Sequence, residues 1–146
     1  MRLGLLIGTL ALALGLAIVT LQTPAPVGRQ AAASEFSAAR AMDDVRLIAR
    51  APHPAGSAEH AAVRERLLAR MTTLGLSPQV QAGALDPRVI QAMREHGVAQ
   101  NLIGVLPGTD PAAPAVVLMA HYDSAVGAPG AADDATGVAA ILEGVR

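Results

Sequence analysis

The chain has 146 residues with one Tyr, one Phe and no Trp, so it can form one domain at most, with a core of aliphatic side chains. The formal net charge is −1, and without a basic surplus a nucleic-acid surface is not expected. Because there is no Cys, disulfides and thiolate metal sites are excluded, and any metal must bind to His and carboxylate groups.

Residues 1–22 are predicted to be a membrane segment. Residues 3–21 carry no charge and consist largely of Leu, Ala, Ile and Val. As a helix, with about 1.5 Å of rise per residue, this stretch would span roughly 28 Å, close to the thickness of a bilayer core. Arg2 and the amino terminus favour a cytoplasmic N-terminus. The remaining residues would then lie outside the cytoplasm, in a periplasmic or extracellular position.

A cleaved signal peptide is the first alternative to a permanent anchor. Its apolar region is normally about 7–15 residues long and is closely followed by a cleavage site of small residues. Here the apolar run is longer, and Pro24 and Pro26 spoil the nearest candidate site. The Ala residues at 31–33 could be cleaved, but they are far from the apolar run. We therefore expect an uncleaved anchor, with secretion after cleavage as the alternative and a buried soluble helix as the third.

Residues 23–34 are rich in Pro, Ala, Gly and Gln, a composition typical of a linker. A helix is predicted over residues 35–50, because four apolar side chains fall near one face: Phe36, Met42, Val45 and Ile48. Two prolines and a glycine in residues 51–56 end that helix.

The next helix is predicted to begin after Ser57, a favourable N-cap, and to end at Gly75, which suits a left-handed residue after a helix. Its apolar residues are spaced by four, four and three: Val63, Leu67, Met71 and Leu74. A short strand is predicted over residues 76–81. Asp86 and Pro87 then favour the start of another helix, over residues 86–97.

Two strands are predicted next, over residues 101–106 and 115–120, joined by turn residues. Residues 115–120 are apolar without alternation, which is typical of a strand covered on both faces in the middle of an α/β sheet. The final residues, 134–146, are predicted to form a helix. Its apolar side chains recur at helical spacing: Val138, Ile141, Leu142 and Val145.

Candidate functional residues follow the predicted buried strand. His121 comes directly after it, and sites in open α/β sheets collect at the carboxyl ends of strands. Asp123 could accept the second ring proton of a metal-bound His121 and so fix its orientation. A turn containing Gly127, Pro129 and Gly130 then leads to residues 133–134, two acids at the start of the last helix, where the helix dipole favours negative charge.

Each of these residues alone has a plain structural interpretation. A single His at a strand end is commonly structural, and an Asp at a helix start is commonly a cap. Calcium binding is disfavoured because residues 123–134 lack the alternating oxygen ligands of an EF-hand loop. Together and in this order, however, the residues indicate a metal site.

The run His-Tyr-Asp-Ser at residues 121–124, followed by Pro-Gly-Ala-Ala-Asp-Asp-Ala-Thr-Gly at 129–137, resembles the metal-binding run of the co-catalytic di-zinc aminopeptidases, metallopeptidase family twenty-eight. The resemblance covers roughly residues 41–146, with similar segments at residues 52–57, 74–76 and 101–108. An anchor ahead of Pro-His-Pro-Ala-Gly-Ser is most similar to the membrane-bound branch related to the endoplasmic reticulum metallopeptidases.

The resemblance implies an α/β fold, in which residues 35–146 form the N-terminal part of a zinc-aminopeptidase-like sheet covered by helices, preceded by one transmembrane helix. It makes His121 a ligand of one Zn2+, Asp133 the carboxylate that bridges two Zn2+, and Asp123 the acid in the catalytic site that orients His121. Asp134 follows the bridging position, where the family often has a cis peptide, and is interpreted as structural. Of the other histidines, His53 is interpreted as structural. His60 and His96 are interpreted as surface residues of helices.

In such enzymes two zincs hold a water and polarise the scissile carbonyl, while a glutamate moves the proton. The implied reaction releases N-terminal residues from peptides, with a peptide substrate and a membrane as partners and no nucleic acid. The general base and remaining ligands are expected beyond Arg146. Glu143, two to three turns into its helix, is not expected to reach the metals. We therefore expect an N-terminal fragment of a membrane-anchored zinc aminopeptidase that is inactive alone.

Other classes share part of this pattern. A non-catalytic, membrane-tethered module that keeps the peptidase shape for binding is the main alternative. Glutaminyl cyclases share the His-x-Asp start, but residues 133–137 are more similar to the peptidase form. The related carboxypeptidase-type di-zinc family also has His-x-Asp, usually with a different sequence around its bridging acid.

Overall fold

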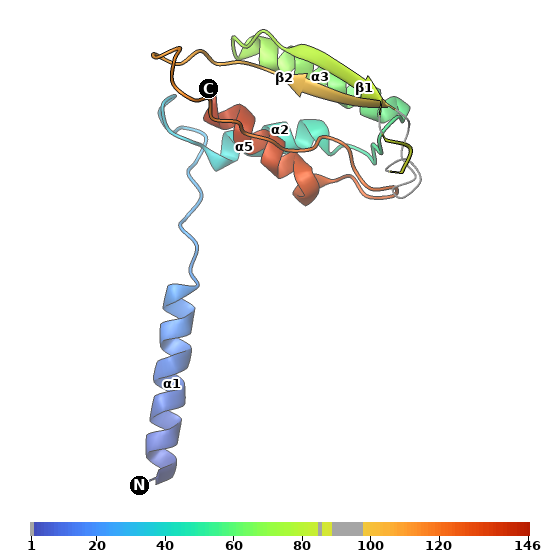
Figure 1. The fold of residues 1–146 in the computed structure, drawn as a ribbon. Helices are drawn as coiled ribbons and strands as arrows, with labels where there is room; N and C mark the ends of the chain where they lie inside the picture. The colour runs from blue at the N-terminus through green and yellow to red at the C-terminus, as the bar shows by residue number, and fades with distance from the viewer. Residues whose placement is uncertain (1, 85, 89–97) are drawn as a thin grey trace.

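The computed structural model describes residues 2–84, 86–88 and 98–146. Helix α1 (Arg2–Thr20) projects away from the globular part of the chain, and none of its residues is buried (Figure 1). By length and composition it could cross a membrane. The predicted apolar helix is thus confirmed. A signal sequence near the N-terminus can meet the same criteria of length and composition, so the choice of a permanent anchor stays a prediction.

Helix α2 (Ala38–Ile48) begins after Ser37, whose side chain accepts a hydrogen bond from the backbone N–H of Arg40. Its buried face consists of Ala41, Asp44, Val45 and Ile48. The predicted positions of Phe36 and Met42 near this face are wrong, because these side chains are 49 % and 41 % exposed. Phe36 precedes the helix, and Met42 lies about 120° around the helix axis from Ile48 at about 100° per residue.

From Val27 onward, the predicted linker lies against α2, and the backbone N–H of Ala39 donates to the Val27 carbonyl at 3.3 Å. The Ser37 hydroxyl donates to the carbonyl of Gly28 at 2.9 Å. The Arg40 guanidinium donates to four backbone carbonyls between residues 29 and 35: those of Arg29, Ala31, Ala32 and Glu35. Among the described residues of the predicted linker, hydrogen bonds to α2 or its cap therefore begin at Val27, and residues 23–26 make none.

Helix α3 (Ala58–Thr73) begins and ends as predicted. The Ser57 side chain accepts a hydrogen bond from the backbone N–H of His60 at 3.1 Å. Gly75 has a φ of 78°, the left-handed conformation that glycine adopts at little cost. Three of the predicted apolar residues are buried along one side of the helix: Val63, Leu67 and Met71. The fourth, Leu74, is half-buried.

The described residues contain one sheet, formed by β1 (Gln79–Ala84) and β2 (Val98–Ile103). The strands are antiparallel, with Gln81 opposite Asn101. Strands near 76–81 and 101–106 were predicted, and both are displaced by three residues. The sheet lies along α3 (Figure 1), and half-buried Leu102 packs against the core. The helix predicted for residues 86–97 falls largely outside the described residues.

Residues 115–120 form no strand, which corrects the prediction of a central buried strand. Val116 is 87 % exposed and Met119 is 85 % exposed. A strand buried on both faces needs neighbouring strands at its edges and helices over its faces. The described residues provide one two-stranded sheet, and residues 115–120 are not part of it. The mixture of helices and a small sheet is consistent with an α/β class, but the described residues do not form the predicted larger sheet.

Helix α5 (Thr136–Gly144) packs on α2 and confirms most of the helix predicted for residues 134–146. It follows η1 (Ala131–Ala135), a π-helical turn in which Asp133 and Asp134 have non-helical backbone angles. Apolar side chains from α2, α3, η1, α5 and the turn after α3 form the core of the described residues: Ala41, Val45, Ile48, Val63, Leu67, Met71, Leu76, Ala135, Ala139 and Leu142.

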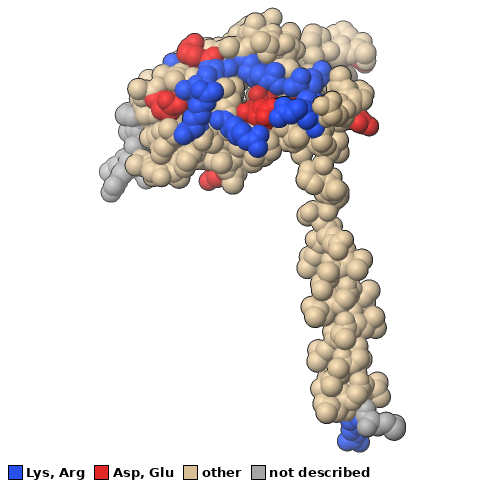
Figure 2. All heavy atoms as spheres, turned by 180° about the vertical axis from the view of Figure 1, so that it is seen from behind, with Lys and Arg blue, Asp and Glu red and all other residues tan. Residues whose placement is uncertain are grey.

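Ion pairs join the helices around this core. The eleven Lys and Arg residues of the sequence are all Arg. On one face of the globular part, several of the described Arg side chains form a band around acidic groups (Figure 2). Arg70 of α3 bonds to the buried Asp44 of α2 through Nε at 2.8 Å and Nη2 at 3.1 Å. Arg40 of α2 bonds to the buried Glu143 of α5 at 2.8 Å. These Arg side chains therefore connect α2 to both of its neighbours.

Candidate metal centre

Three residues singled out in the sequence lie together. The His121 Nε2 atom is 2.9 Å from Asp133 Oδ1. The other ring nitrogen, Nδ1, is 3.3 Å from Asp123 Oδ1 and 3.2 Å from the Asp123 backbone carbonyl. Both ring nitrogens thus face oxygen atoms. When the carboxyl groups are ionised, these oxygens accept hydrogen bonds and cannot donate them. Positive charge is therefore favoured between His121 and Asp133. It can come from a second ring proton, which makes the imidazole cationic, or from a metal ion bound at Nε2.

The electrostatics of His121 agree with this geometry. Burial lowers the pKa of His121, but the hydrogen bond to Asp133 and the charge of Asp123 outweigh it, and the net pKa is raised. The site is open, since the side chains of His121 and Asp133 are 51 % and 91 % exposed. The Asp133 carboxylate is accessible to a further cation from solvent.

Asp134 points into the start of α5. Its Oδ1 atom accepts a hydrogen bond from the backbone N–H of Gly137 at 3.0 Å. A Cβ at Gly137 would lie 2.4 Å from that oxygen, so the close approach requires glycine. The peptide bond between Asp133 and Asp134 is cis, as the family resemblance implied. Asp134 therefore has the structural position predicted for it.

The other histidines divide into one confirmed and one corrected prediction. His53 is 1 % exposed, and its Nδ1 atom contacts the Ala51 carbonyl at 2.8 Å, so its structural role is confirmed. His60 was predicted to be a surface residue, which is wrong, because it is 8 % exposed. Its ring stacks on Tyr122, with centroids 4.6 Å apart and planes at 9°. His96 lies outside the described residues.

Sequence reasoning missed the residues that support the segment containing His121. The Tyr122 hydroxyl donates to the Gln100 carbonyl at 2.8 Å, and the buried Ser124 hydroxyl accepts a hydrogen bond from the backbone N–H of His53 at 2.8 Å. These contacts join residues 22 and 71 positions apart, so no local periodicity could reveal them. The one signal was that Tyr122 is the single tyrosine of the chain.

The donor set is compatible with part of a zinc site. Zinc binds to imidazole nitrogen and carboxylate oxygen, which His121 and Asp133 provide side by side. Within the described ranges, no group of three or more His, Cys, Asp or Glu side chains could hold a metal ion. The described residues therefore offer fewer protein ligands than a complete zinc site needs. The metal-binding roles of His121 and Asp133 stay predictions.

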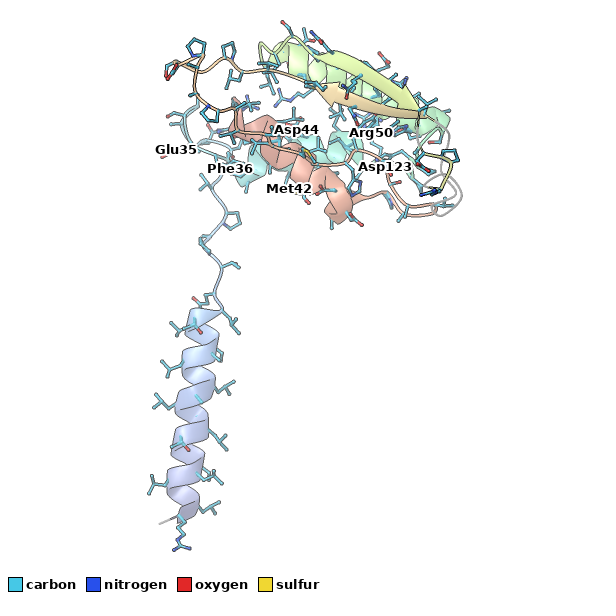
Figure 3. All side chains as sticks on the ribbon, in the orientation of Figure 1. Glu35, Phe36, Met42, Asp44, Arg50 and Asp123 are labelled. Atoms are coloured by element: carbon cyan, nitrogen blue, oxygen red, sulfur yellow. The ribbon has the colours of Figure 1, made fainter. Side chains whose placement is uncertain are left out.

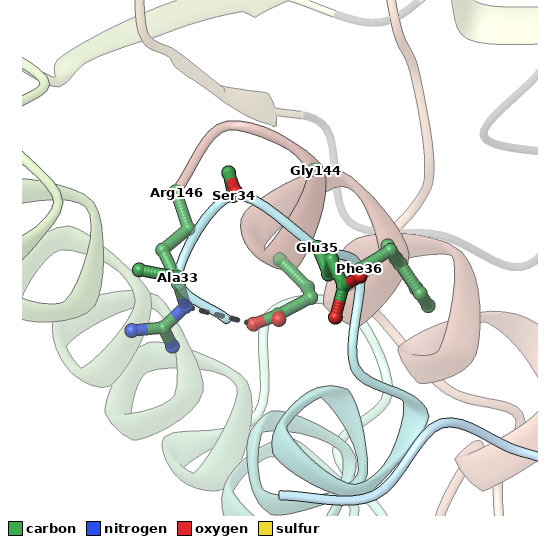
Figure 4. A pocket seen from close by; sticks show the side chains of 7 residues that line it. Ala33, Ser34, Glu35, Phe36, Gly144 and Arg146 are labelled. Atoms are coloured by element: carbon green, nitrogen blue, oxygen red, sulfur yellow. Dashed lines mark hydrogen bonds and ion pairs between the residues drawn. The ribbon is translucent and has the colours of Figure 1, made fainter. Parts of the chain in front are cut away.

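Glu143, the nearest acid on the last helix, is engaged elsewhere. Its carboxylate accepts hydrogen bonds from the backbone N–H of Ser37, from Arg40 and from Arg146. It borders an open hollow between residues 33–36 and the end of α5 (Figure 4). Glu35 and Phe36 from this hollow lie on the opposite side of the globular part from Asp123 (Figure 3). The hollow is therefore separate from the candidate metal centre.

The candidate metal centre lies in a part of the chain that is similar in sequence to known proteases. Residues 101–146 match the model of peptidase family M28. The chain is similar to a vacuolar membrane protease of Candida tropicalis, with 33 % identity over 104 residues, or 68 % of the chain. Similar proteins of the same description occur in Schizophyllum commune, 33 % identical over 71 % of the chain, and in Candida dubliniensis, 30 % identical over 70 % of the chain. The match spans 12 % of the length of each relative. No solved structure matches the chain.

Proposed function

Because the chain belongs to peptidase family M28, we propose that it contributes the first ligands of a zinc-dependent aminopeptidase site held at a membrane. The observation that carries this proposal is the 2.9 Å approach of His121 Nε2 to Asp133 Oδ1, with Asp123 on the other side of the ring. The relatives are described as membrane proteases, which supports a peptidase associated with a membrane.

Each residue has a distinct task in this proposal. Asp123 holds the Nδ1 side of the His121 ring, which leaves Nε2 to bind a metal. Asp133 has two carboxylate oxygens, so it can bind two cations at once, and its 91 % exposure keeps both accessible. Zinc, when bound, supplies a Lewis acid and an activated water for peptide hydrolysis. The residues of this chain bind and orient, and none of the described residues is proposed as the general base.

We further propose that the 146-residue chain alone does not hydrolyse peptides. Its described residues hold no group of three ligands, and the Glu143 carboxylate is bonded to Arg40 and Arg146. Helix α1 would anchor the chain, with the peptidase part outside the cytoplasm, because the basic Arg2 precedes the apolar stretch. Zinc-dependent release of an N-terminal residue by the purified chain would contradict the proposed inactivity.

A second candidate is a membrane-tethered module that keeps the peptidase shape without catalysis. The lack of a third clustered ligand among the described residues favours it. The two candidates differ in their requirement for metal. A peptidase portion should bind zinc through His121 and Asp133, whereas a pure binding module has no need to do so.

Zinc titration of the chain in detergent micelles tests the proposal. We expect calorimetry to detect Zn2+ binding that His121→Ala or Asp133→Asn weakens at least tenfold, in line with the loss of one ligand. Glu65→Gln is the matched control, because Glu65 is an exposed acid on α3 whose contact is with Arg64. Equal zinc affinity in all variants would rule out His121 and Asp133 as ligands.

A further inference from the structure

We propose that Ser124 and Gly130 are positioning residues, whose contact fixes the distance between His121 and Asp133. The inference rests on the proposed function for its purpose, since that distance matters to a metal bound by the two side chains. The contact itself is independent of any metal. It involves two residues that carry no ligand atom of their own in the proposal.

Ser124 is fixed on one side by the segment that follows α2. The backbone N–H of His53 donates to the Ser124 hydroxyl at 2.8 Å, and the backbone N–H of Ser124 donates to the His53 carbonyl at 3.2 Å. His53 and Ser124 are 1 % and 5 % exposed. His53 and Ser124 each donate one hydrogen bond to the other, and both bonds are buried. Ser124 therefore has little freedom to shift, because breaking either bond would leave a buried polar group without a partner.

Ser124 meets Gly130 on its other side. A Cβ placed on Gly130 would lie 2.9 Å from the Ser124 Cβ and 3.0 Å from the Asp133 carbonyl oxygen. Gly130 also has a φ of 67°, and its carbonyl accepts a hydrogen bond from the backbone N–H of Ala135 at 3.0 Å. Because Gly130 has no side chain, the turn before Asp133 can approach Ser124.

This contact connects the two halves of the candidate centre. Ser124 lies three residues after His121, and Gly130 lies three residues before Asp133. The loop between them, residues 125–129, is exposed throughout, so packing of the loop does not determine how far apart its ends lie. His53 holds Ser124 in place, and Ser124 contacts Gly130. This contact therefore fixes the positions of the two chain segments that carry His121 and Asp133.

Gly127 provides a matched control within the same loop. Its φ of 85° is also in the left-handed region, so alanine there meets a comparable backbone penalty. A Cβ at Gly127 would meet nothing within 4 Å. Gly130→Ala and Gly127→Ala therefore share the loop strain and differ in the contact with Ser124 and Asp133.

The experiment measures the position of His121 directly in the isotope-labelled full chain in detergent micelles, without metal. With only four histidines in the sequence, the ring protons of His121 can be assigned, and their nuclear Overhauser contact with the Asp133 β-protons can be followed. We expect this contact in the unmodified chain and in Gly127→Ala, and its loss in Gly130→Ala. Ser124→Ala, which removes the hydroxyl bond to His53 without adding an atom, should weaken it.

The outcomes separate positioning from folding. Retention of the contact in both Gly130→Ala and Ser124→Ala overturns the inference, as does equal loss in Gly127→Ala, which would assign the effect to loop strain. If Gly130→Ala loses the helical circular dichroism signal, Ser124→Ala with an intact signal decides the question. The stacking contact between His60 and Tyr122 should persist in every informative variant, because a general structural defect would also disturb it.

A parallel Zn2+ titration distinguishes this inference from the proposed function. We expect Gly130→Ala to weaken zinc binding by about tenfold or more, the range typical of residues that support metal ligands. If the unmodified chain shows the His121–Asp133 contact but binds no zinc, the proposed function fails while the positioning role stands. If it binds zinc through His121 with equal affinity in Gly130→Ala and Gly127→Ala, the positioning role fails while the proposed function stands.

Discussion

Residues 115–120 and residues 121–124 are adjacent in the chain but are held very differently. The first segment is apolar and exposed, with no strand partner among the described residues. Two residues of the second segment are bonded to earlier parts of the chain, Tyr122 to Gln100 and Ser124 to His53. The geometry of the candidate centre therefore depends on contacts with α3, β2 and residues 51–54. It does not depend on the sheet position predicted for residues 115–120.

The exposed segment at residues 115–120 also contributes less burial free energy than the core does. Fully burying a side chain such as Val or Leu gains about 1.5–3 kcal/mol relative to leaving it exposed. Residues 115–120 gain little of this in the present fold, whereas the core residues of α2, α3 and α5 gain most of it. The helical layer and its ion pairs should therefore account for the stability of the globular part.

The largest effect is expected at Glu143, which connects α5 to α2. The Glu143 side chain is fully buried and bonds to Arg40, whose side chain is 13 % exposed. Replacing Glu143 with Ala leaves Arg40 largely buried without its partner, which should lower the free energy of unfolding by about 3 kcal/mol or more. Urea unfolding followed by circular dichroism measures it. Asp43→Ala on the exposed side of α2 is the control, and an equal loss there would contradict the prediction.

The same carboxylate predicts a pH dependence. Burial raises the pKa of Glu143, but bonds from Arg146, Ser37 and Arg40 outweigh it, and the net pKa is lowered. A lowered folded-state pKa contributes stability that is complete above the unfolded value of about 4.3 and is lost as the pH falls through the folded value. We expect the unfolding midpoint to drop with acidification in this range. Glu143→Gln should flatten that slope, and an unchanged slope would exclude Glu143 as its source.

A matched pair of valines compares the core with the exposed segment. Val63 on α3 is 0 % exposed and Val116 is 87 % exposed. Val63→Ala should cost about 2 kcal/mol of unfolding free energy through lost burial and the cavity left behind. Val116→Ala should change it by less than about 0.5 kcal/mol. A similar cost at both positions would mean that residues 115–120 are buried in solution and would overturn the comparison.

Local signals in the sequence were sufficient for the two ends of α3. Ser57 and Gly75 bound α3 because a cap and a left-handed residue act within one turn of the chain. The family resemblance implied that His121, Asp123 and Asp133 belong to one site, and the structure places these side chains together. The motif therefore predicted which side chains meet.

The failures share a physical cause, which is dependence on distant partners. An apolar run forms a buried strand only if other strands lie beside it, and for residues 115–120 none does among the described residues. His60 is buried because Tyr122, far along the chain, covers it. Phe36 was assigned to a helix that in fact begins after Ser37. A hydrophobic pattern gives the capacity for burial, while the partner that covers the residue is set by the tertiary fold.

An effect smaller than that of Val63→Ala is expected at Tyr122, which lies between the exposed segment and the site. Tyr122→Phe keeps the stack on His60 but removes the hydrogen bond to the Gln100 carbonyl. A typical hydrogen bond contributes about 1 kcal/mol, so the thermal midpoint should fall slightly. Tyr122→Ala, which also removes the stack, should cost more and move the His121 ring signals in nuclear magnetic resonance spectra. If Tyr122→Phe and Tyr122→Ala have equal effects, the stack does not contribute, and only the polar contacts hold the segment that carries His121.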